Sequence, residues 1–388
     1  MKNILLCDAN FCVLPIVASI MSKNYNLSVV GSLVSDPAHQ IAHESILLNY
    51  ANVKLLREHI VNNHYDYIVP GCNDRSYLSL AEIAGEFRYP GFDDYETVLT
   101  IHHKDKFRAF AEKKGYPIPK FVDDINKVSS LNFPIIIKPI DSFSGKGTNK
   151  VERVTDVNQN WNEAIKFSKT GSVIAEEFIE GKLYSHSAFI KNKKIIIDFF
   201  VSEYCTIYPY QVNSSNISTQ LSIDIQQKLK NWTEQFAQDL DLVDGLIHTQ
   251  FISDNNTFSL IEVTRRCPGD LYSKLIQMST GINYSELYSM PFMGLELPIN
   301  VEKNQNKFIS RHTVSVDREC VFIASTIRLK NEAIENIQLK TSGQKMKAAP
   351  FDKSGIYFIE FNNAQEMEEK TEMLKDYILI ETLNISGK

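Results

Sequence analysis

Short apolar runs alternate with segments of helical periodicity over the first 100 residues. Asn73 or Asp74 is suited to cap a helix that follows the Pro70-Gly71 pair. Strand and helix in alternation predict a doubly wound parallel sheet, in which ligands bind at the carboxyl ends of the strands. No G-x-G-x-x-G follows the first run, so no dinucleotide site is indicated. The predicted strands are 3–7, 27–33, 45–48 and 65–69, and the predicted helices are 13–21 and 53–62.

A second pattern begins near residue 100 and mixes longer helices with paired strands. A polar, Ser/Asn-rich stretch at 206–219 has no clear period and predicts a loop. The fold class is therefore α/β and α+β, and we expect units at 1–100, 101–299 and 300–388, the last a small α+β segment. The predicted helices are 104–114, 157–167, 223–240, 271–279, 284–290 and 364–375, and the predicted strands are 133–138, 172–177, 183–191, 194–201, 245–252, 257–263, 308–316, 320–326 and 355–361.

Composition narrows the class of protein without naming a function. The 388 residues are 43% hydrophobic and 23% charged, as in ordinary globular proteins. A net charge of −6 does not favour a general nucleic-acid binder. No apolar run reaches the ~18 residues of a membrane helix, and Asp8 and Asn10 interrupt the apolar N-terminus, so neither a membrane span nor a signal peptide is expected. Six scattered cysteines without a C-x-x-C pair predict free thiols, and we expect a cytoplasmic protein.

A lysine followed by a Ser/Gly loop is the first candidate for chemistry. Lys138 ends an apolar strand, and the loop that follows runs from Ser142 to Gly147. Main-chain N–H groups of glycine-rich turns can approach phosphate oxygens closely because no Cβ blocks them. The loop lacks the P-loop pattern, and taken alone it is more simply explained as an ordinary Ser/Gly hairpin loop.

The predicted hairpin at 245–263 is the second candidate. Period-two counting places Gln250 on one face of its first strand, while Glu262 and Thr264 share a face of the second. Across a hairpin Gln250 and Glu262 can converge, and oxygen ligands at the end of a hairpin suit Mg²⁺. Arg265 and Arg266 follow at once, where they could stabilise a transferring phosphoryl group. The alternative is a half-exposed strand carrying a Glu–Arg pair.

The order of these features along the chain resembles the ATP-grasp superfamily. Lys106 precedes GYPIP, then come FPIIIKP with its loop, AEEFIEG, and finally HTQF and LIEVTRR. The resemblance covers about residues 1–300 and includes bacterial L-amino acid ligases and biotin carboxylase-like enzymes. It implies a pre-ATP-grasp α/β domain, a two-subdomain ATP-grasp core whose lid spans about 120–180, and ATP with Mg²⁺ or Mn²⁺ as cofactors.

The resemblance also implies a role for individual residues. Lys106 and Lys138 would contact phosphates, Lys138 and Arg266 would be catalytic, and the loop would close over the triphosphate. Main-chain groups of Glu177 and Ile179 would bind adenine. The loop residues are Ser142, Ser144, Gly145 and Gly147, the adenine segment is Glu176, Glu177, Phe178, Ile179 and Glu180, and the metal ligands are Gln250, Glu262 and Thr264.

Three positions depart from the family pattern. Many members have Glu where this chain has Gln250, and Asn where it has Thr264. Leu183 stands where a ribose-binding Glu is common, and Glu180 is the substitute candidate for that contact. The implied activity is ADP-forming carboxylate–amine ligation of small molecules through an acyl phosphate, with an amino acid or similar acid as the activated substrate. The departures motivate a second hypothesis, a catalytically weakened ATP-binding module, and a small-molecule kinase is a third.

The substrates are less well determined. Arg266 or Arg311 could hold the carboxylate, and the Asn73–Arg75 cluster at a strand end could bind amino or hydroxyl groups. His102 and His103 are expected at the surface. Partners would be the carboxylate and amine substrates, without nucleic acid or membrane, and a homodimer is a further expectation.

Overall fold

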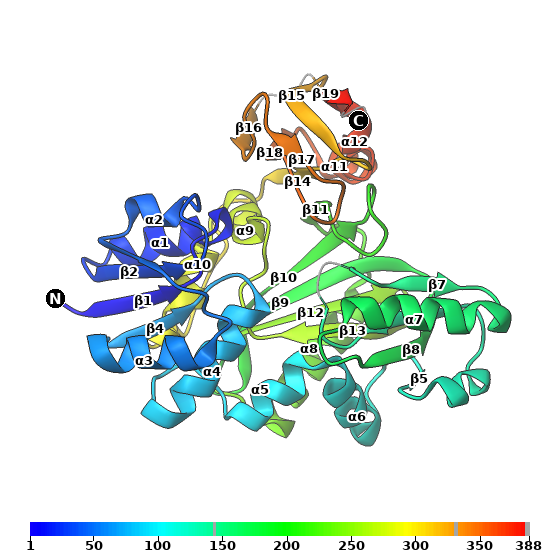
Figure 1. Cartoon of the computed structure of the whole chain (residues 1–388), viewed down its shortest axis with the longest axis horizontal. Coiled ribbons are helices and arrows are strands. Elements are labelled where there is room, and N and C mark those ends of the chain that lie inside the picture. The colour runs from blue at the N-terminus through cyan, green and yellow to red at the C-terminus, as the bar shows by residue number, and fades with distance from the viewer. Residues whose placement is uncertain (143–144, 330–332, 385–388) are drawn as a thin grey trace.

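The computed structural model describes residues 1–142, 145–329 and 333–384. Its helices and strands form three parts around a central sheet (Figure 1). An N-terminal α/β part lies at the left of the view, a smaller green unit with α7 at the right, and the C-terminal segment at the top. Among the described residues no helix combines the length and apolar character needed to cross a bilayer.

The N-terminal part is built on a four-stranded parallel sheet of order β3-β2-β1-β4. Successive residues of β1 enter different cores: Ile4 and Leu6 join one, and Leu5 and Cys7 the other. A strand buried on both faces is the mark of a doubly wound sheet, so this prediction is confirmed. The elements are β1 (Asn3–Cys7), η1 (Phe11–Val13), α1 (Leu14–Met21), β2 (Asn26–Gly31), α2 (Ala38–Ile41), β3 (Glu44–Leu47), α3 (Val53–Asn63), β4 (Tyr67–Pro70), α4 (Asp74–Phe87), α5 (Tyr95–His102) and α6 (Lys104–Lys114).

A second four-stranded sheet, antiparallel and of order β5-β8-β6-β7, forms the unit at the right of Figure 1. Helix α7 covers it, with Trp161 and Ala164 packed in the same core as Ile135 and Ile137. We call this unit the lid. Its elements are β5 (Phe121–Val122), η2 (Ile125–Ser130), β6 (Ile135–Pro139), β7 (Asn149–Val151), η3 (Val154–Asp156), α7 (Val157–Phe167) and β8 (Val173–Glu177).

An eight-stranded sheet of order β13-β12-β9-β10-β11-β14-β18-β16 joins the centre of the molecule to its C-terminal part. The predicted hairpin is confirmed, with Gln250 of β12 directly opposite Glu262 of β13. The elements are β9 (Lys182–Lys191), β10 (Lys194–Tyr204), β11 (Ser214–Ile217), α8 (Ile223–Asp239), β12 (Gly245–Ser253), β13 (Phe258–Thr264), α9 (Tyr272–Thr280), α10 (Tyr284–Ser289), η4 (Pro291–Met293), β14 (Phe308–Val314), β16 (Ala333–Gln338) and β18 (Gly355–Phe361).

Strand β11 contradicts the prediction of a loop over 206–219. Its residues Ser214, Ser215 and Asn216 are polar yet fully buried. The strand pairs with β10 on one side and β14 on the other, so its main chain is satisfied by partners about 10 and 100 residues away. Tertiary pairing of this kind overrides the low β-propensity of Ser and Asn.

The C-terminal segment is divided between two sheets. Strands β14, β18 and β16 extend the eight-stranded sheet, whereas the other three strands form a separate sheet of order β17-β15-β19. The domain boundaries at 100 and 299 stay a prediction. The remaining elements are β15 (Cys320–Ile327), β17 (Lys345–Met346), α11 (Ala364–Thr371), α12 (Leu374–Tyr377) and β19 (Ile378–Asn384).

Candidate functional site

A buried chain of charges connects the lid with the eight-stranded sheet. Lys138 at the end of β6 donates to Glu176 Oε2 at 2.7 Å, and Arg108 of α6 donates to Glu176 Oε1 at 2.9 Å. The same guanidinium donates to the carbonyl of Ile261 at 2.9 Å, one residue before Glu262. Lys138 and Glu262, both predicted site residues, therefore lie in one connected cluster.

Burial determines the charge state of this cluster. Burial lowers the pKa of Lys138 to about 8, although the Glu176 carboxylate opposes the shift. Burial raises the pKa of Glu176, but Arg108 and Lys138 outweigh this and bring it to about 2. Glu176 is therefore a fixed anion that orients Lys138, and this role differs from the adenine contact predicted for its segment. Sequence reasoning missed Arg108.

The hairpin presents oxygen atoms to the same region. The Glu262 side chain is 34% exposed, and its Oε1 lies 3.5 Å from Lys104 Nζ. Gln250 donates its amide Nε2 to Glu203 Oε2 at 2.7 Å, so the amide oxygen stays available as an acceptor. In the described ranges no three His, Cys, Asp or Glu side chains gather to hold a metal by themselves. The donor set fits Mg²⁺, which needs few protein oxygens when phosphates supply the others.

Lys106, for which a phosphate contact is predicted, lies outside the cluster in the structure. Its side chain is 42% exposed and lies 3.7 Å from Glu96, away from the cluster. Lys104, two residues earlier, occupies the position beside Glu262 and also donates to the carbonyl of Ser142 at 3.0 Å. Residues two apart on a helix point to nearly opposite faces. When Lys104 faces the hairpin, Lys106 therefore cannot face it as well.

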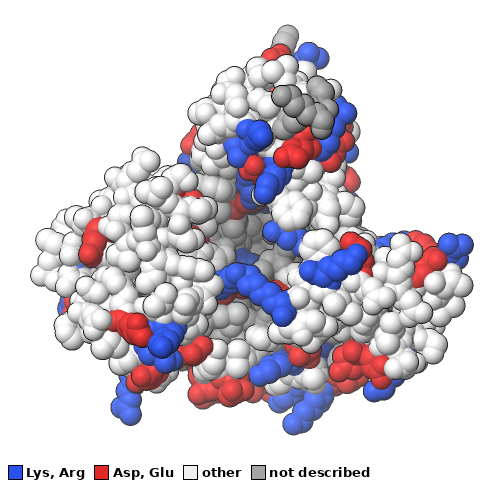
Figure 2. All heavy atoms as spheres, in the orientation of Figure 1, with Lys and Arg blue, Asp and Glu red and all other residues white. Residues whose placement is uncertain are grey.

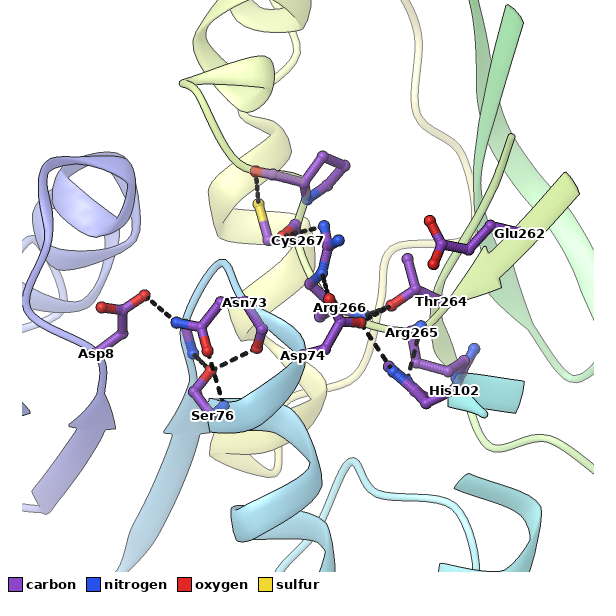
Figure 3. A network of polar contacts seen from close by, with 12 residues as sticks. Asp8, Asn73, Asp74, Ser76, His102, Glu262, Thr264, Arg265, Arg266 and Cys267 are labelled. Atoms are coloured by element: carbon purple, nitrogen blue, oxygen red, sulfur yellow. Dashed lines mark hydrogen bonds and ion pairs between the residues drawn. The ribbon is translucent and has the colours of Figure 1, made fainter. Parts of the chain in front are cut away.

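Arg266 is held at the mouth of the cluster by the N-terminal part. Its Nε lies 3.0 Å from Asp74 Oδ2, and the Thr264 hydroxyl lies 3.5 Å from Asp74 Oδ1. In Figure 3 the Glu262 carboxylate points toward Arg266. Burial raises the pKa of Asp74, but Arg266 and His102 lower it overall. Asp74 is therefore an anion that ties α4 to the predicted catalytic arginine.

His102 is not at the surface, contrary to the prediction. Its side chain is fully buried, its Nδ1 lies 3.1 Å from Asp74 Oδ1, and its ring stacks on Tyr77 at 4.8 Å. Asn73 also has a structural role, because it caps α4 through the N–H of Ser76 and donates to Asp8. The predicted substrate cluster at this strand end is therefore largely satisfied by internal contacts.

Arg265 and Arg266 have different environments although they are adjacent. Arg265 Nε lies 2.8 Å from Asp93 Oδ2, and both side chains are 2% exposed. Its remaining N–H groups donate to the carbonyls of Leu246 and Val243. Arg265 thus anchors the hairpin, and Arg266 is the arginine that faces the candidate site.

The loop between β6 and β7 lies against two other loops. Ser142 Oγ donates to the carbonyl of Lys146 at 2.8 Å, and Lys146 Nζ lies 4.8 Å from the centre of the Phe351 ring. Gly145 has φ +70°, and a Cβ there would lie 2.7 Å from the carbonyl oxygen of Tyr210. The lid loop therefore touches both the β10–β11 connection and the C-terminal segment. Gly147 has φ +74° and adjoins Phe167, while Ser144 lies outside the described residues.

The predicted adenine segment follows β8. The N–H groups of Glu177 and Phe178 are already used, donating to the carbonyls of Lys120 and Pro134. Glu180 is exposed, and Glu177 accepts from the N–H of Asn132. Within the described part of the chain the Ile179 N–H has no main-chain partner, so of the two predicted main-chain contacts Ile179 is the better placed.

These elements surround a hollow. Figure 2 shows that the molecule is hollowed where its three parts meet and that Lys and Arg side chains gather around the hollow. Lys104, Lys138 and Arg266 come from α6, β6 and the end of β13, three elements far apart in sequence. Several cations beside one exposed carboxylate suit a polyanionic ligand with a divalent metal.

Comparison with known sequences finds a family match within the chain. Residues 131–274 match the family described as ATP-grasp domain. A formate-dependent phosphoribosylglycinamide formyltransferase of Prochlorococcus marinus subsp. pastoris is 30% identical over 190 residues, covering 46% of this chain and 48% of that protein. A protein of the same name from another Prochlorococcus marinus strain is 27% identical over 303 residues, covering 72% of this chain and 73% of its own length.

Solved structures match over the whole chain. L-amino acid ligase from Bacillus licheniformis superposes with a TM-score of 0.80 at 16% identity, covering 99% of both chains. Phosphoribosylglycinamide synthetase from Anaerococcus prevotii gives a TM-score of 0.77 at 17% identity, covering 98% of this chain and 99% of that one. At these identities the structural likeness shows the fold alone. The comparisons therefore show an ATP-grasp domain over residues 131–274 and, over the whole chain, the fold of these solved structures.

Proposed function

We propose that this protein activates a small-molecule carboxylate with ATP, forming an acyl phosphate and ADP, and transfers the acyl group to an amine. The carboxylate oxygen attacks the γ-phosphate, and the amine then displaces inorganic phosphate. The activated substrate is an amino acid or a similar acid. The protein's part is positioning and charge neutralisation, because phosphoryl transfer asks little covalent chemistry of the enzyme.

One observation carries this proposal, the continuous chain of contacts from Lys138 to Lys104. It runs from Lys138 through Glu176 and Arg108 to the Ile261 carbonyl, and Glu262 next to it lies beside Lys104. Two lysines and a carboxylate therefore converge from the lid, α6 and the hairpin. A triphosphate between them would contact both lysines at once.

The remaining roles follow from position. Glu262, the amide oxygen of Gln250 and the Thr264 hydroxyl would hold Mg²⁺, which would neutralise charge on the phosphates. Arg266, fixed by Asp74, would bind the γ-phosphate or the acyl phosphate. The lid loop with Gly145 and Gly147 would cover the triphosphate and exclude water from the acyl phosphate.

The test is a screen of carboxylates with MgATP, with hydroxylamine present to trap acyl phosphate as a hydroxamate. Carboxylate-dependent ADP release together with a hydroxamate of the expected mass supports ligase chemistry. Tight ATP binding without ADP release would support a weakened ATP-binding module, for which the amide of Gln250 in place of a carboxylate is the motivating observation. A stable phosphate ester, seen by phosphorus NMR, would indicate a kinase.

Lys104 and Lys106 form a matched pair of variants. Lys104→Met is expected to reduce kcat/KM for ATP by about 10- to 100-fold, because hydrogen bonds to charged groups contribute about 1.5–3 kcal/mol. Lys106→Met removes the same charge from the same helix. Because the Lys106 side chain faces Glu96 and not the candidate site, kcat/KM for ATP should change less than about twofold. Steady-state ADP release measures both. Equal losses in the two variants would contradict the assignment of Lys104.

The pKa of Lys138 predicts a pH dependence of ATP binding. Because burial lowers this pKa to about 8 in the presence of Glu176, Arg108 and Lys104, the lysine loses its charge as the pH rises above 8. ATP affinity should then fall by up to about tenfold per pH unit above 8. Lys138→Arg keeps its charge in this range and should remove the alkaline decline. Titration of ATP binding between pH 6.5 and 9.5 tests this, and an alkaline decline that persists in Lys138→Arg would refute it.

A further inference from the structure

Three buried polar side chains form a row across neighbouring strands of the eight-stranded sheet. Ser215 of β11 is paired directly with Glu203 of β10 and with Arg311 of β14. Directly paired residues on adjacent strands point to the same face of a sheet, and the strands lie about 4.8 Å apart. Glu203, Ser215 and Arg311 are 6%, 0% and 3% exposed. We call these three residues the polar row.

The polar row begins at the candidate metal site. Glu203 Oε2 accepts the amide of Gln250 at 2.7 Å, and Gln250 lies opposite Glu262. The other end of the row reaches the loop after β13, because Arg311 Nη1 donates to the carbonyl of Asp270 at 2.9 Å. A ligand along the row would therefore have one end beside the metal site and the other at Arg311.

In the described residues the two charges of the row contact neutral groups and no group of opposite charge. Arg311 donates to main-chain carbonyls, and neither it nor Glu203 forms an ion pair within residues 1–142, 145–329 and 333–384. Nearby, the Asp270 carboxylate forms an ion pair with Lys353 and accepts a hydrogen bond from the Thr313 hydroxyl. Arg311 attracts the Glu203 carboxylate through space but forms no ion pair with it, so a ligand that contacts both buried charges is favoured.

Unsatisfied hydrogen-bonding atoms occur in the same row. Ser215 Oγ and Arg311 Nε are both buried, and neither has a hydrogen-bond partner in the described chain. Buried polar atoms in native structures nearly always have partners. Ser215 Oγ lies between the Glu203 and Arg311 strands, and Arg311 Nε belongs to the guanidinium itself, so a molecule with polar groups that reaches both atoms would complete the row.

We propose that the polar row binds the amine substrate and that this substrate is an amino acid, with its ammonium group at Glu203 and its carboxylate at Arg311. The proposal rests on the proposed function. The carboxylate at Arg311 is not the one that is activated, because Arg311 lies two strands beyond Glu203, away from Glu262 and Lys104. The ammonium end, in contrast, lies beside Gln250, where the acyl phosphate would form.

The experiment measures binding, so it does not depend on turnover. The full-length protein with Mg²⁺ and a non-hydrolysable ATP analogue is titrated calorimetrically with the twenty L-amino acids, β-alanine and γ-aminobutyrate. Each amino acid that binds is compared with its carboxamide and its decarboxylated amine. We expect at least one amino acid to bind, and its amide and amine to bind at least tenfold more weakly. Failure of every amino acid to bind, or equal binding of the amide, overturns the proposal.

Variants locate the site. Arg311→Gln should equalise the affinities for the amino acid and its amide, whereas Arg318→Gln, an exposed arginine of the following turn, should leave the wild-type ratio unchanged. Glu203→Gln should weaken amino acid binding at least tenfold. Two further results would overturn the proposal: an unchanged ratio of amino acid to amide affinity in Arg311→Gln, or tighter binding of phosphoethanolamine than of any amino acid to the wild type. If Arg311→Gln does not fold, Glu203→Gln decides, because an amino acid bound as the activated substrate would not lose affinity in that variant; unchanged binding in Glu203→Gln then overturns the proposal.

The two proposals fail in different ways. Hydroxamate formation reports activation of the donor carboxylate and needs no acceptor amine. Its absence would count against the proposed function, whereas loss of discrimination between amino acid and amide would count against the polar row only.

Discussion

Replacing Glu262 with glutamine should lower the rate of magnesium-dependent ADP release by about 100-fold or more, because a metal ion supplies several kcal/mol of charge stabilisation in phosphoryl transfer. Glu262 is the carboxylate of the hairpin pair, since its neighbour Gln250 is neutral. Glutamine keeps the shape of the side chain and removes the charge that holds the cation. Steady-state ADP release over a range of Mg²⁺ concentrations measures the effect.

Two controls make this result specific. Glu262 is 34% exposed, so the free energy of unfolding of Glu262→Gln should stay within about 1 kcal/mol of the wild type. Gln250→Glu adds a carboxylate opposite Glu262 but also sets it against Glu203, which accepts the Gln250 amide, so the Mg²⁺ concentration needed for half-maximal rate should fall in the double variant Gln250→Glu, Glu203→Gln. An unfolded Glu262→Gln protein, or one that keeps full activity, would show that the residue has another role.

Glu176→Gln is expected to have the largest effect on stability. Glu176 is 3% exposed and is the direct partner of both Arg108 and Lys138, so the variant leaves two buried cations facing a neutral amide. Removing one partner of a buried ion pair costs about 3–5 kcal/mol of unfolding free energy. The affinity for ATP should also fall, because Lys138 loses both its orientation and the carboxylate that favours its charged form.

Glu177→Gln is the matched control, since the next residue is also a glutamate, and among the described residues its side chain accepts from Asn132 alone, at the surface. Its unfolding free energy should change by less than about 1 kcal/mol. Urea denaturation followed by circular dichroism compares the two variants. Similar losses in both would mean that the buried chain of charges is not the source of stability.

Much of the fold could be predicted because its pattern is local. The β1 run is apolar from Ile4 to Cys7, which is typical of a strand buried on both faces, and these residues have this environment. The hairpin was predictable from two alternating runs about a short turn, and this register placed Gln250 opposite Glu262. In both cases neighbours in sequence decide the structure.

Other features depend on partners far along the chain. Ser214–Ile217 has the composition of a loop and becomes a strand only because β10 and β14 lie on either side of it. His102 is buried because Asp74 and Tyr77, more than 20 residues away, surround it. No local pattern distinguishes such residues from surface ones.

The candidate site was predictable as a set of segments but less so as a set of side chains. Lys104 and Lys106 both begin α6, and the sequence does not show which face of that helix meets the hairpin. Arg108 looks like any charged residue of a helix, yet it lies 1% exposed between Glu176 and Ile261. Rotation of a helix about its axis is set by tertiary packing, which decides which lysine enters the site.

The continuous eight-stranded sheet has a consequence for how such proteins diversify. Its β13 and β12 end carries the metal candidates, while Arg311 is on β14, a strand of the C-terminal segment. An exchange of the C-terminal segment between relatives would therefore replace the Arg311 end of the polar row and keep the nucleotide end intact. Specificity for a different amine substrate could arise by recombination at a single crossover near residue 300, because the residues at the nucleotide end of the sheet would stay unchanged.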